Sequence, residues 1–173
     1  MIGINPGLSS EPERRFYRER GPTYKAVVEY WKKNICARPY YKRLRAFADE
    51  VGLGRSILWT ELVKCESKKR TNLSVQTIRA DIHRYLFREI KNIPDNWPLI
   101  GAGTRAYEIL SFSFPERTII GLPHPTGSFG QYTRLMKNGR LKTEAQRIVM
   151  DVLKKSDSTC RSFKFKEREW KFQ

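Results

Sequence analysis

The chain has 173 residues, close to one domain at about 150 residues per domain, and 39% of them are hydrophobic, enough for a buried core. Lysine and arginine number 34 against 18 acidic residues, so the net charge of +16 makes a polyanion, with nucleic acid first, the expected partner instead of a small neutral metabolite. Three cysteines without a CxxC pair argue against a disulfide framework or a zinc ribbon. The sequence has no apolar run of the length that crosses a membrane or directs secretion, so we expect an intracellular, soluble, monomeric protein that does not bind membranes.

The first half of the chain alternates apolar segments with turn residues. Residues 1–4 are expected to end a buried strand, which turns at Asn5. Apolar residues with helical spacing then predict helices around residues 24–31 and 44–51. The apolar run at 56–65 predicts a second strand, followed by a polar loop.

The second half repeats this alternation. Ser74 is expected to cap a helix whose apolar residues, from Ile78 to Ile90, are well periodic. The remaining expected elements are strands at 97–100 and 117–122 and helices at 106–110 and 141–153. Strands that alternate with helices imply an α/β fold with a parallel sheet covered on both faces.

Two further expectations concern organisation. Residues 1–155 should form the domain, and residues 156–173 a basic C-terminal tail with interleaved aromatic residues. The tail is compatible with an edge strand, a DNA-binding arm or a packing flap. Because ligands of parallel sheets bind beyond the carboxyl ends of the strands, the loops at 5–7, 61–65 and 124–127 should converge there.

The segment Gly101–Ala106 formally fits the dinucleotide fingerprint GxGxxA. It comes late in the chain, and no acidic residue follows about 20 positions on to bind a ribose, so we interpret it as a tight strand-to-helix turn and do not predict NAD binding. His83 is expected to be structural or at the surface. His124 differs because two prolines flank it at a strand end and restrict its backbone.

The segment Gly3–Ser10 (GINPGLSS) closely resembles the first active-site motif of the mismatch-specific uracil/thymine branch of the uracil-DNA glycosylase superfamily. Further resemblances to the superfamily follow in order along the chain, at Arg15–Tyr17, Leu62–Cys65 and Leu99–Ala106, and His124–Gly127 is similar to its second active-site motif. The resemblance implies a three-layer α/β/α sandwich around a four-stranded parallel sheet. It also implies a DNA glycosylase, an enzyme of base excision repair.

The resemblance assigns roles to several residues. Asn5 would position the attacking water, and a neutral His124 would donate a hydrogen bond to the base as negative charge develops on it. Phe16 would stack on the flipped base, and Gly3, Ile4 and Glu61 would complete the base pocket. Contacts to single- or double-stranded DNA would come from Ser9, Ser10, Thr126, Gly127, Ser128, Phe129, Lys68, Lys69 and Arg70.

Some of these residues have alternative interpretations. The serine and threonine hydroxyls could serve turns and caps, and each basic residue could be a solvated charge. Phe129 stands where relatives of the iron–sulfur branch place a wedge leucine, and it could either enter the base stack or anchor its own loop.

The sequence departs from the iron–sulfur branch of the superfamily in two further ways. Relatives carry four cysteine ligands, whereas here Cys65 has no CxxC partner and Ile82 stands where another cysteine is expected; we considered a 4Fe–4S cluster and expect no cofactor and no metal. Relatives also have an asparagine four residues before that cysteine, where this chain has Glu61. A carboxylate suits a base that presents donors, such as an exocyclic amine, and a protonated Glu61 would suit a wider set of bases. Alternatively, Glu61 could point away and pair with Lys64 or an arginine.

The predicted function is therefore that of a monofunctional DNA glycosylase that hydrolyses the N-glycosidic bond of uracil or a related lesion base. The alternative is a catalytically silent nucleic-acid-binding module on the same fold. A weaker third possibility is a hydrolase that acts on nucleosides or RNA.

Overall fold

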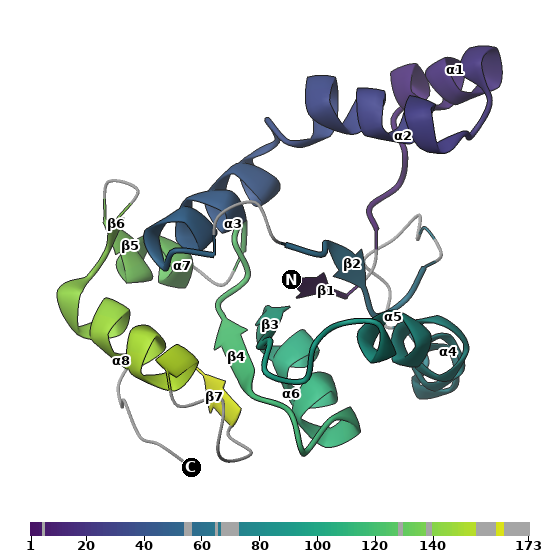
Figure 1. Ribbon diagram of the computed structural model, residues 1–173. Helices are drawn as coiled ribbons and strands as arrows, with labels where there is room; N and C mark the ends of the chain where they lie inside the picture. The colour runs from purple at the N-terminus through teal and green to yellow at the C-terminus, as the bar shows by residue number, and fades with distance from the viewer. Residues whose placement is uncertain are drawn as a thin grey trace.

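The computed structural model describes residues 1–4, 6–53, 57–64, 66, 73–127, 130–137, 140–154 and 162–164. A parallel sheet with strand order β2-β1-β3-β4-β7 lies at the centre of the molecule (Figure 1). Its strands are β1 (Ile2–Gly3), β2 (Thr60–Glu61), β3 (Leu99–Ala102), β4 (Ile119–Leu122) and β7 (Ser162–Lys164). The predicted α/β fold and four-stranded parallel sheet are confirmed in β2-β1-β3-β4. A fifth strand, β7, pairs with β4, so part of the basic tail joins the sheet edge.

Helices cover both faces of this sheet. One face carries α3 (Pro39–Glu50), α7 (Gln131–Leu135) and α8 (Thr143–Lys154), and the other carries α4 (Val75–Asp81), η2 (Ile82–Leu86), α5 (Phe87–Lys91) and α6 (Thr104–Ser113). A short antiparallel hairpin, β5 (Met136–Lys137) and β6 (Arg140–Leu141), connects α7 to α8. The remaining helices, α1 (Glu11–Arg20), α2 (Tyr24–Tyr30) and the π-helical turn η1 (Trp31–Ile35), follow β1, and α1 and α2 extend beyond the sheet (Figure 1).

Side chains alternate between the two faces along each strand, as the pleat requires. In β4, Ile119 packs against the helices of the α6 face, whereas Ile120 and Leu122 pack against α3 and α8. Each face therefore has its own apolar cluster, which explains why the strands read as unbroken hydrophobic runs in the sequence. Within the described residues, no helix combines the length and apolarity that a membrane span requires.

Glycines allow close packing at the end of β3. A Cβ on Gly101 would lie 2.8 Å from the backbone nitrogen of Tyr107, so only glycine lets α6 approach the strand this closely. Gly103 has a φ of +104° and caps α6, which begins at Thr104. The interpretation of residues 101–106 as a tight strand-to-helix turn is confirmed.

Several predicted elements are confirmed in type but differ in extent. Ser74 caps α4 by accepting a hydrogen bond from the Thr77 amide at 3.0 Å, as expected. Of the strand predicted at 56–65, only Thr60–Glu61 is regular strand among the described residues, although the Leu62 and Val63 amides still donate to the Gly3 and Ile4 carbonyls, both at 2.9 Å. Leu62 and Val63 are apolar because they are buried in the cluster under α4 and α5. Leu141, predicted to begin the last helix, lies in β6 instead. In both segments, apolar residues are buried in the core although they lie outside the strand β2 or the helix α8.

Candidate functional site

The sheet changes winding direction beside β1. After β1 the chain adds β2 on one side, and it then returns to add β3 and β4 on the other. Ligands of doubly wound sheets bind outside the carboxyl ends of the strands at such a point. All strands of this sheet are parallel, so residues that follow β1, β2, β3 and β4 meet at one edge.

Glu61, at the carboxyl end of β2, lies directly over Gly3 of the neighbouring strand β1. A Cβ on Gly3 would lie 2.7 Å from the carboxyl carbon of Glu61 and would collide with its oxygens. Glycine at this position therefore leaves the space that the carboxyl group occupies. Gly3 also belongs to the β-ladder, since its carbonyl accepts a hydrogen bond from the Leu62 amide at 2.9 Å.

The Glu61 carboxyl group lines a cavity of about 190 Å³ between the sheet edge and α3. Aromatic side chains make much of its wall, and the lining includes Gly3, Trp31, Tyr40, Tyr41, Trp59 and Glu61. The rings pack on one another, with centroids 4.6 Å apart for Trp31 and Tyr41 and 4.9 Å apart for Tyr40 and Tyr41. A cavity of about 150 Å³ is enough to hold benzene, so this one accommodates a planar ring. We call it the Glu61 cavity.

His124 follows β4, three strands along from β2 at the same sheet edge, where it covers Gly103. A Cβ on Gly103 would lie 3.6 Å from the Cβ and Cδ2 atoms of His124. The imidazole ring also contacts Tyr40, with ring centroids 5.3 Å apart. Tyr40 thus links His124 to the wall of the Glu61 cavity.

The loop that carries His124 has a defined hydrogen-bonding pattern. The Thr126 amide donates to Nδ1 of His124 at 3.4 Å, and the Thr126 hydroxyl lies 3.5 Å from the same nitrogen. A neutral ring that accepts at Nδ1 carries its proton on Nε2. The Arg43 side chain on α3 donates to the Pro125 carbonyl, and the Tyr132 hydroxyl in turn donates to the Arg43 carbonyl at 2.6 Å. These bonds fix the loop against α3.

Burial dominates the electrostatics of Glu61. It raises the pKa of the carboxyl group to about 7, although the nearby Lys64 ammonium acts in the opposite direction. Burial, with the Glu61 charge as the second cause, also raises the pKa of Tyr41 to about 12 and raises that of Tyr40. Among the described residues, Oε2 of Glu61 is buried and has no hydrogen-bond partner.

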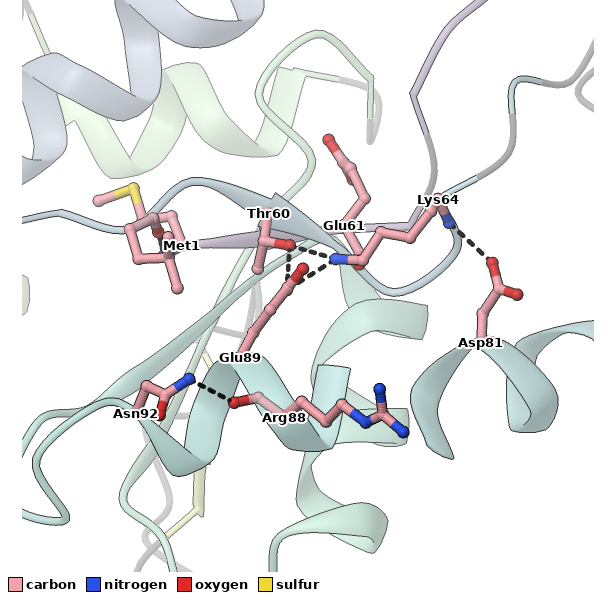
Figure 2. Close-up of polar contacts among 9 residues, drawn as sticks. Met1, Thr60, Glu61, Lys64, Asp81, Arg88, Glu89 and Asn92 are labelled. Carbon is pink, nitrogen blue, oxygen red and sulfur yellow. Dashed lines mark hydrogen bonds and ion pairs between the residues drawn. The ribbon is translucent and has the colours of Figure 1, made fainter. Parts of the chain in front are cut away.

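Lys64 belongs to a separate polar cluster on the other side of β2. Its ammonium donates to Oε2 of Glu89 and to the main-chain carbonyl of Glu61, at 2.7 and 2.8 Å, and also to the Thr60 hydroxyl. The Thr60 hydroxyl donates to the same Glu89 oxygen at 2.7 Å. Figure 2 shows the Glu61 side chain directed away from this cluster. The alternative in which Glu61 pairs with Lys64 is therefore wrong: Lys64 binds Glu89.

The structure brings some of the other sequence-predicted residues to this edge and places others elsewhere. Phe16 lies on α1 in a cluster with Tyr17 and Tyr30, with ring centroids 5.4 and 5.0 Å away, and does not line the Glu61 cavity. The Ile4 side chain packs into the apolar cluster on the opposite face.

The predicted DNA contacts are only partly accessible in this structure. Thr126 and Gly127 are exposed beside His124, and Ser10 is exposed at the start of α1. The Ser9 hydroxyl donates to the carboxylate of Glu66, which joins the loop after β1 to the loop after β2 and lowers the pKa of Glu66. The convergence of these two loops agrees with the parallel topology. Ser9, predicted to contact a DNA phosphate, is bonded to the Glu66 carboxylate in this structure.

Other predicted residues lie outside the described ranges, namely Asn5, Cys65, Lys68, Lys69, Arg70, Ser128 and Phe129. Their roles stay predictions. Within the part of the chain that the structure describes, no group of three or more histidine, cysteine or acidic side chains is placed to hold a metal ion.

The aromatic wall is the part of the site that sequence reasoning missed. Tyr40 and Tyr41 follow the break at Arg38-Pro39 and begin α3, and Trp59 comes two residues before Glu61. For Trp59, the short distance to Glu61 along the chain was a signal that sequence reasoning could have used. For Trp31, Tyr40 and Tyr41 the signal exists only in the packing of η1 and α3 against β2.

Comparisons with known proteins add no assignment. No protein-family model matches the chain, and the search of curated proteins finds no significantly similar relative. Function must therefore be inferred from the motifs and from the geometry of the sheet edge.

Proposed function

We propose that this chain is a monofunctional, intracellular DNA glycosylase of the uracil-DNA glycosylase superfamily, which hydrolyses the N-glycosidic bond of a base flipped into the Glu61 cavity. One observation carries the proposal. Glu61 and His124, separated by more than a third of the chain, lie at the carboxyl ends of β2 and β4 on the same sheet edge, and Tyr40 both contacts the His124 ring and lines the Glu61 cavity. The collinear motifs at Gly3–Ser10 and His124–Gly127 support the same conclusion.

Breaking a base–sugar bond develops positive charge on the sugar and returns an electron pair to the base. Asn5, directly after β1, is proposed to hold the water that attacks C1′ of the deoxyribose. His124 is proposed to donate from Nε2 to an oxygen of the departing base, since the Thr126 amide occupies Nδ1. No covalent enzyme intermediate is needed, so the product is an abasic site.

Access to the bond requires that the base leave the duplex. Aromatic walls then stabilise the extruded ring, as stacking does in other single-stranded nucleic-acid sites. The net charge of +16 supplies the counterion-dependent attraction to the DNA backbone. Exposed basic residues on α1, such as Arg14 and Arg15, are proposed to contribute to it.

The test is an abasic-site assay. Single- and double-stranded oligonucleotides that contain uracil or one of several damaged bases are incubated with the protein and then treated with alkali. We expect strand scission with at least one base, its loss in Asn5→Ala and His124→Ala, and its retention in His83→Ala. His83 is a matched control because it is the other of the two histidines and is exposed on η2.

Salt-sensitive DNA binding without scission across the whole panel would contradict catalysis. That result would favour the binding module on the same fold.

A further inference from the structure

The starting observation is a carboxyl group that lacks a partner. Oε2 of Glu61 is buried with no hydrogen-bond partner among the described residues, although buried polar atoms are almost always satisfied. An unsatisfied buried group destabilises the folded state. An acceptor kept in this condition points to a donor that arrives with a ligand.

Neither of the two neighbouring ammonium groups serves as that donor. The N-terminal ammonium of Met1, which also lowers the pKa of Glu61, donates to the Leu58 carbonyl at 2.6 Å. Lys64 has three acceptors of its own, in Glu89, Thr60 and the Glu61 carbonyl, and its ammonium lies away from the Glu61 carboxyl group (Figure 2). Glu61 therefore retains the capacity to balance a positive charge inside the cavity. A carboxylate accepts hydrogen bonds and donates none, so it selects ligands with N–H groups.

The walls favour the same kind of ligand. Trp31, Trp59, Tyr40 and Tyr41 line the cavity, and all four side chains are only partly buried. Aromatic faces attract cations through the ring quadrupole, most strongly in tryptophan, and cages of such rings bind methylated ammonium groups. Aromatic rings beside a carboxyl oxygen that has no hydrogen-bond partner among the described residues form a site for a flat cation.

We propose that the Glu61 cavity selects a nucleobase that carries a positive charge through N-alkylation and presents an N–H donor to the Glu61 carboxylate. This inference rests on the proposed glycosylase function and specifies its substrate class. 7-Methylguanine and 3-methylcytosine are the purine and pyrimidine representatives, since each is cationic in DNA and carries an exocyclic amine.

The reaction balances without an acid at the base. Water forms a bond to C1′, and the C1′–N bond breaks with its electron pair going to the base. That pair neutralises the positive charge of the alkylated base, which leaves as a neutral molecule, and one proton of the water passes to the solvent. A cationic base is thus already activated as a leaving group, and the enzyme needs to hold it and to place the water.

The first experiment measures binding alone. Affinities for 7-methylguanosine and guanosine are compared by quenching of tryptophan fluorescence, since Trp31 and Trp59 line the cavity. We expect at least ten-fold tighter binding of the methylated nucleoside, loss of this preference in Glu61→Gln, and no change in the matched control Glu144→Gln on the surface of α8. Equal affinity for the two nucleosides, including no measurable binding of either, would overturn the inference.

A second variant keeps the test decisive if Glu61→Gln fails to fold. In Gly3→Ala the new Cβ meets the Glu61 carboxyl group and must displace it, while the Glu61 residue itself is kept. We expect the preference for the methylated nucleoside to fall several-fold with thermal stability nearly unchanged. An unaltered preference in both variants would place the carboxylate outside recognition.

The second experiment separates this inference from the proposed function. Duplexes with one 7-methylguanine, 3-methylcytosine or uracil are incubated with the protein, and abasic sites are cut by an abasic-site endonuclease at neutral pH, because alkali attacks 7-methylguanine. We expect at least ten-fold faster release of a methylated base than of uracil.

The binding experiment and the base-release experiment distinguish failure of the substrate class from failure of the glycosylase function. Release of uracil without release of either methylated base refutes the substrate class and leaves the glycosylase standing. Binding of 7-methylguanosine without release of any base refutes the glycosylase and leaves the cation site standing.

Discussion

Glu61 and Glu89 lie close together around β2, yet they differ in almost every physical respect. Glu89 accepts from the Lys64 ammonium and the Thr60 hydroxyl, both at 2.7 Å. Glu61 faces the aromatic cavity with a pKa of about 7, and its Oε2 has no hydrogen-bond partner among the residues that the structure describes. A carboxylate whose oxygens accept hydrogen bonds from neighbouring residues holds structural elements together. A carboxylate in a cavity with an unsatisfied oxygen indicates a ligand-binding site. Four substitutions test this difference.

The largest expected effect is the pH-dependent stability change in Glu61→Gln. Burial raises the pKa of Glu61 from 4.5 to about 7, so the folded state holds the proton more tightly and the free energy of unfolding falls as the pH rises between these values. Since ten-fold in proton affinity is about 1.4 kcal/mol, the variant gains up to about 3 kcal/mol over wild type at pH 8 and little at pH 4. Denaturant titrations at both pH values measure this. An equal difference at the two pH values would mean that the carboxyl group is not buried.

Glu89→Gln should act in the opposite direction. It removes the counter-charge of Lys64, and hydrogen bonds to charged groups contribute about 1.5–3 kcal/mol, so we expect a loss of about 2 kcal/mol at pH 7. The selectivity of the Glu61 cavity should stay unchanged, because Glu89 does not line it. Thermal unfolding together with nucleoside binding measures both quantities. Altered selectivity with intact stability would reverse the roles assigned to the two carboxylates.

Thr60→Val removes only the hydroxyl that Lys64 and Glu89 share. Because the Lys64–Glu89 ion pair remains, the expected loss is about 1 kcal/mol. The double variant Thr60→Val/Glu89→Gln should lose less than the sum of the two single variants, since both act on one network. Strict additivity in denaturant titrations would show that the hydroxyl acts independently.

The smallest stability effect is expected from Gly3→Ala, below about 1 kcal/mol, because the atoms that its Cβ meets belong to the end of a flexible side chain. Gly101→Ala is the matched comparison. There the Cβ meets the backbone of α6, which cannot move alone, and overpacking of about 1–3 kcal/mol is expected. Equal losses in thermal unfolding would mean that Glu61 is held rigidly over Gly3.

Much of the fold was predictable because its signals are local. The Ser74 cap, the periodic apolar face from Ile78 to Ile90 and the turn at Gly103 depend on neighbouring residues and have the predicted form. Short elements escaped prediction. The helix α7 and the hairpin β5–β6 contain too few residues for any periodicity to stand out.

The site was predictable only in outline. Parallel strands imply that residues following them share an edge, and His124 and Glu61 do lie at that edge. The direction of the Glu61 side chain was undecidable from the sequence, where Lys64 stood at a plausible pairing distance. Packing decided it, because α5 places Glu89 against Lys64.

The sequence alone determined the alternation of strands and helices, the excess of positive charge and the glycine-containing turn that follows β3. These follow from composition and from spacing along the chain. Only the tertiary structure decided that Glu89 is paired whereas Oε2 of Glu61 lacks a hydrogen-bond partner within the described ranges. It also decided that aromatic rings from η1, α3 and the segment before β2 line the cavity at Glu61. The physical reason is that hydrogen-bond saturation and burial depend on elements distant in sequence, which meet only when the sheet is covered.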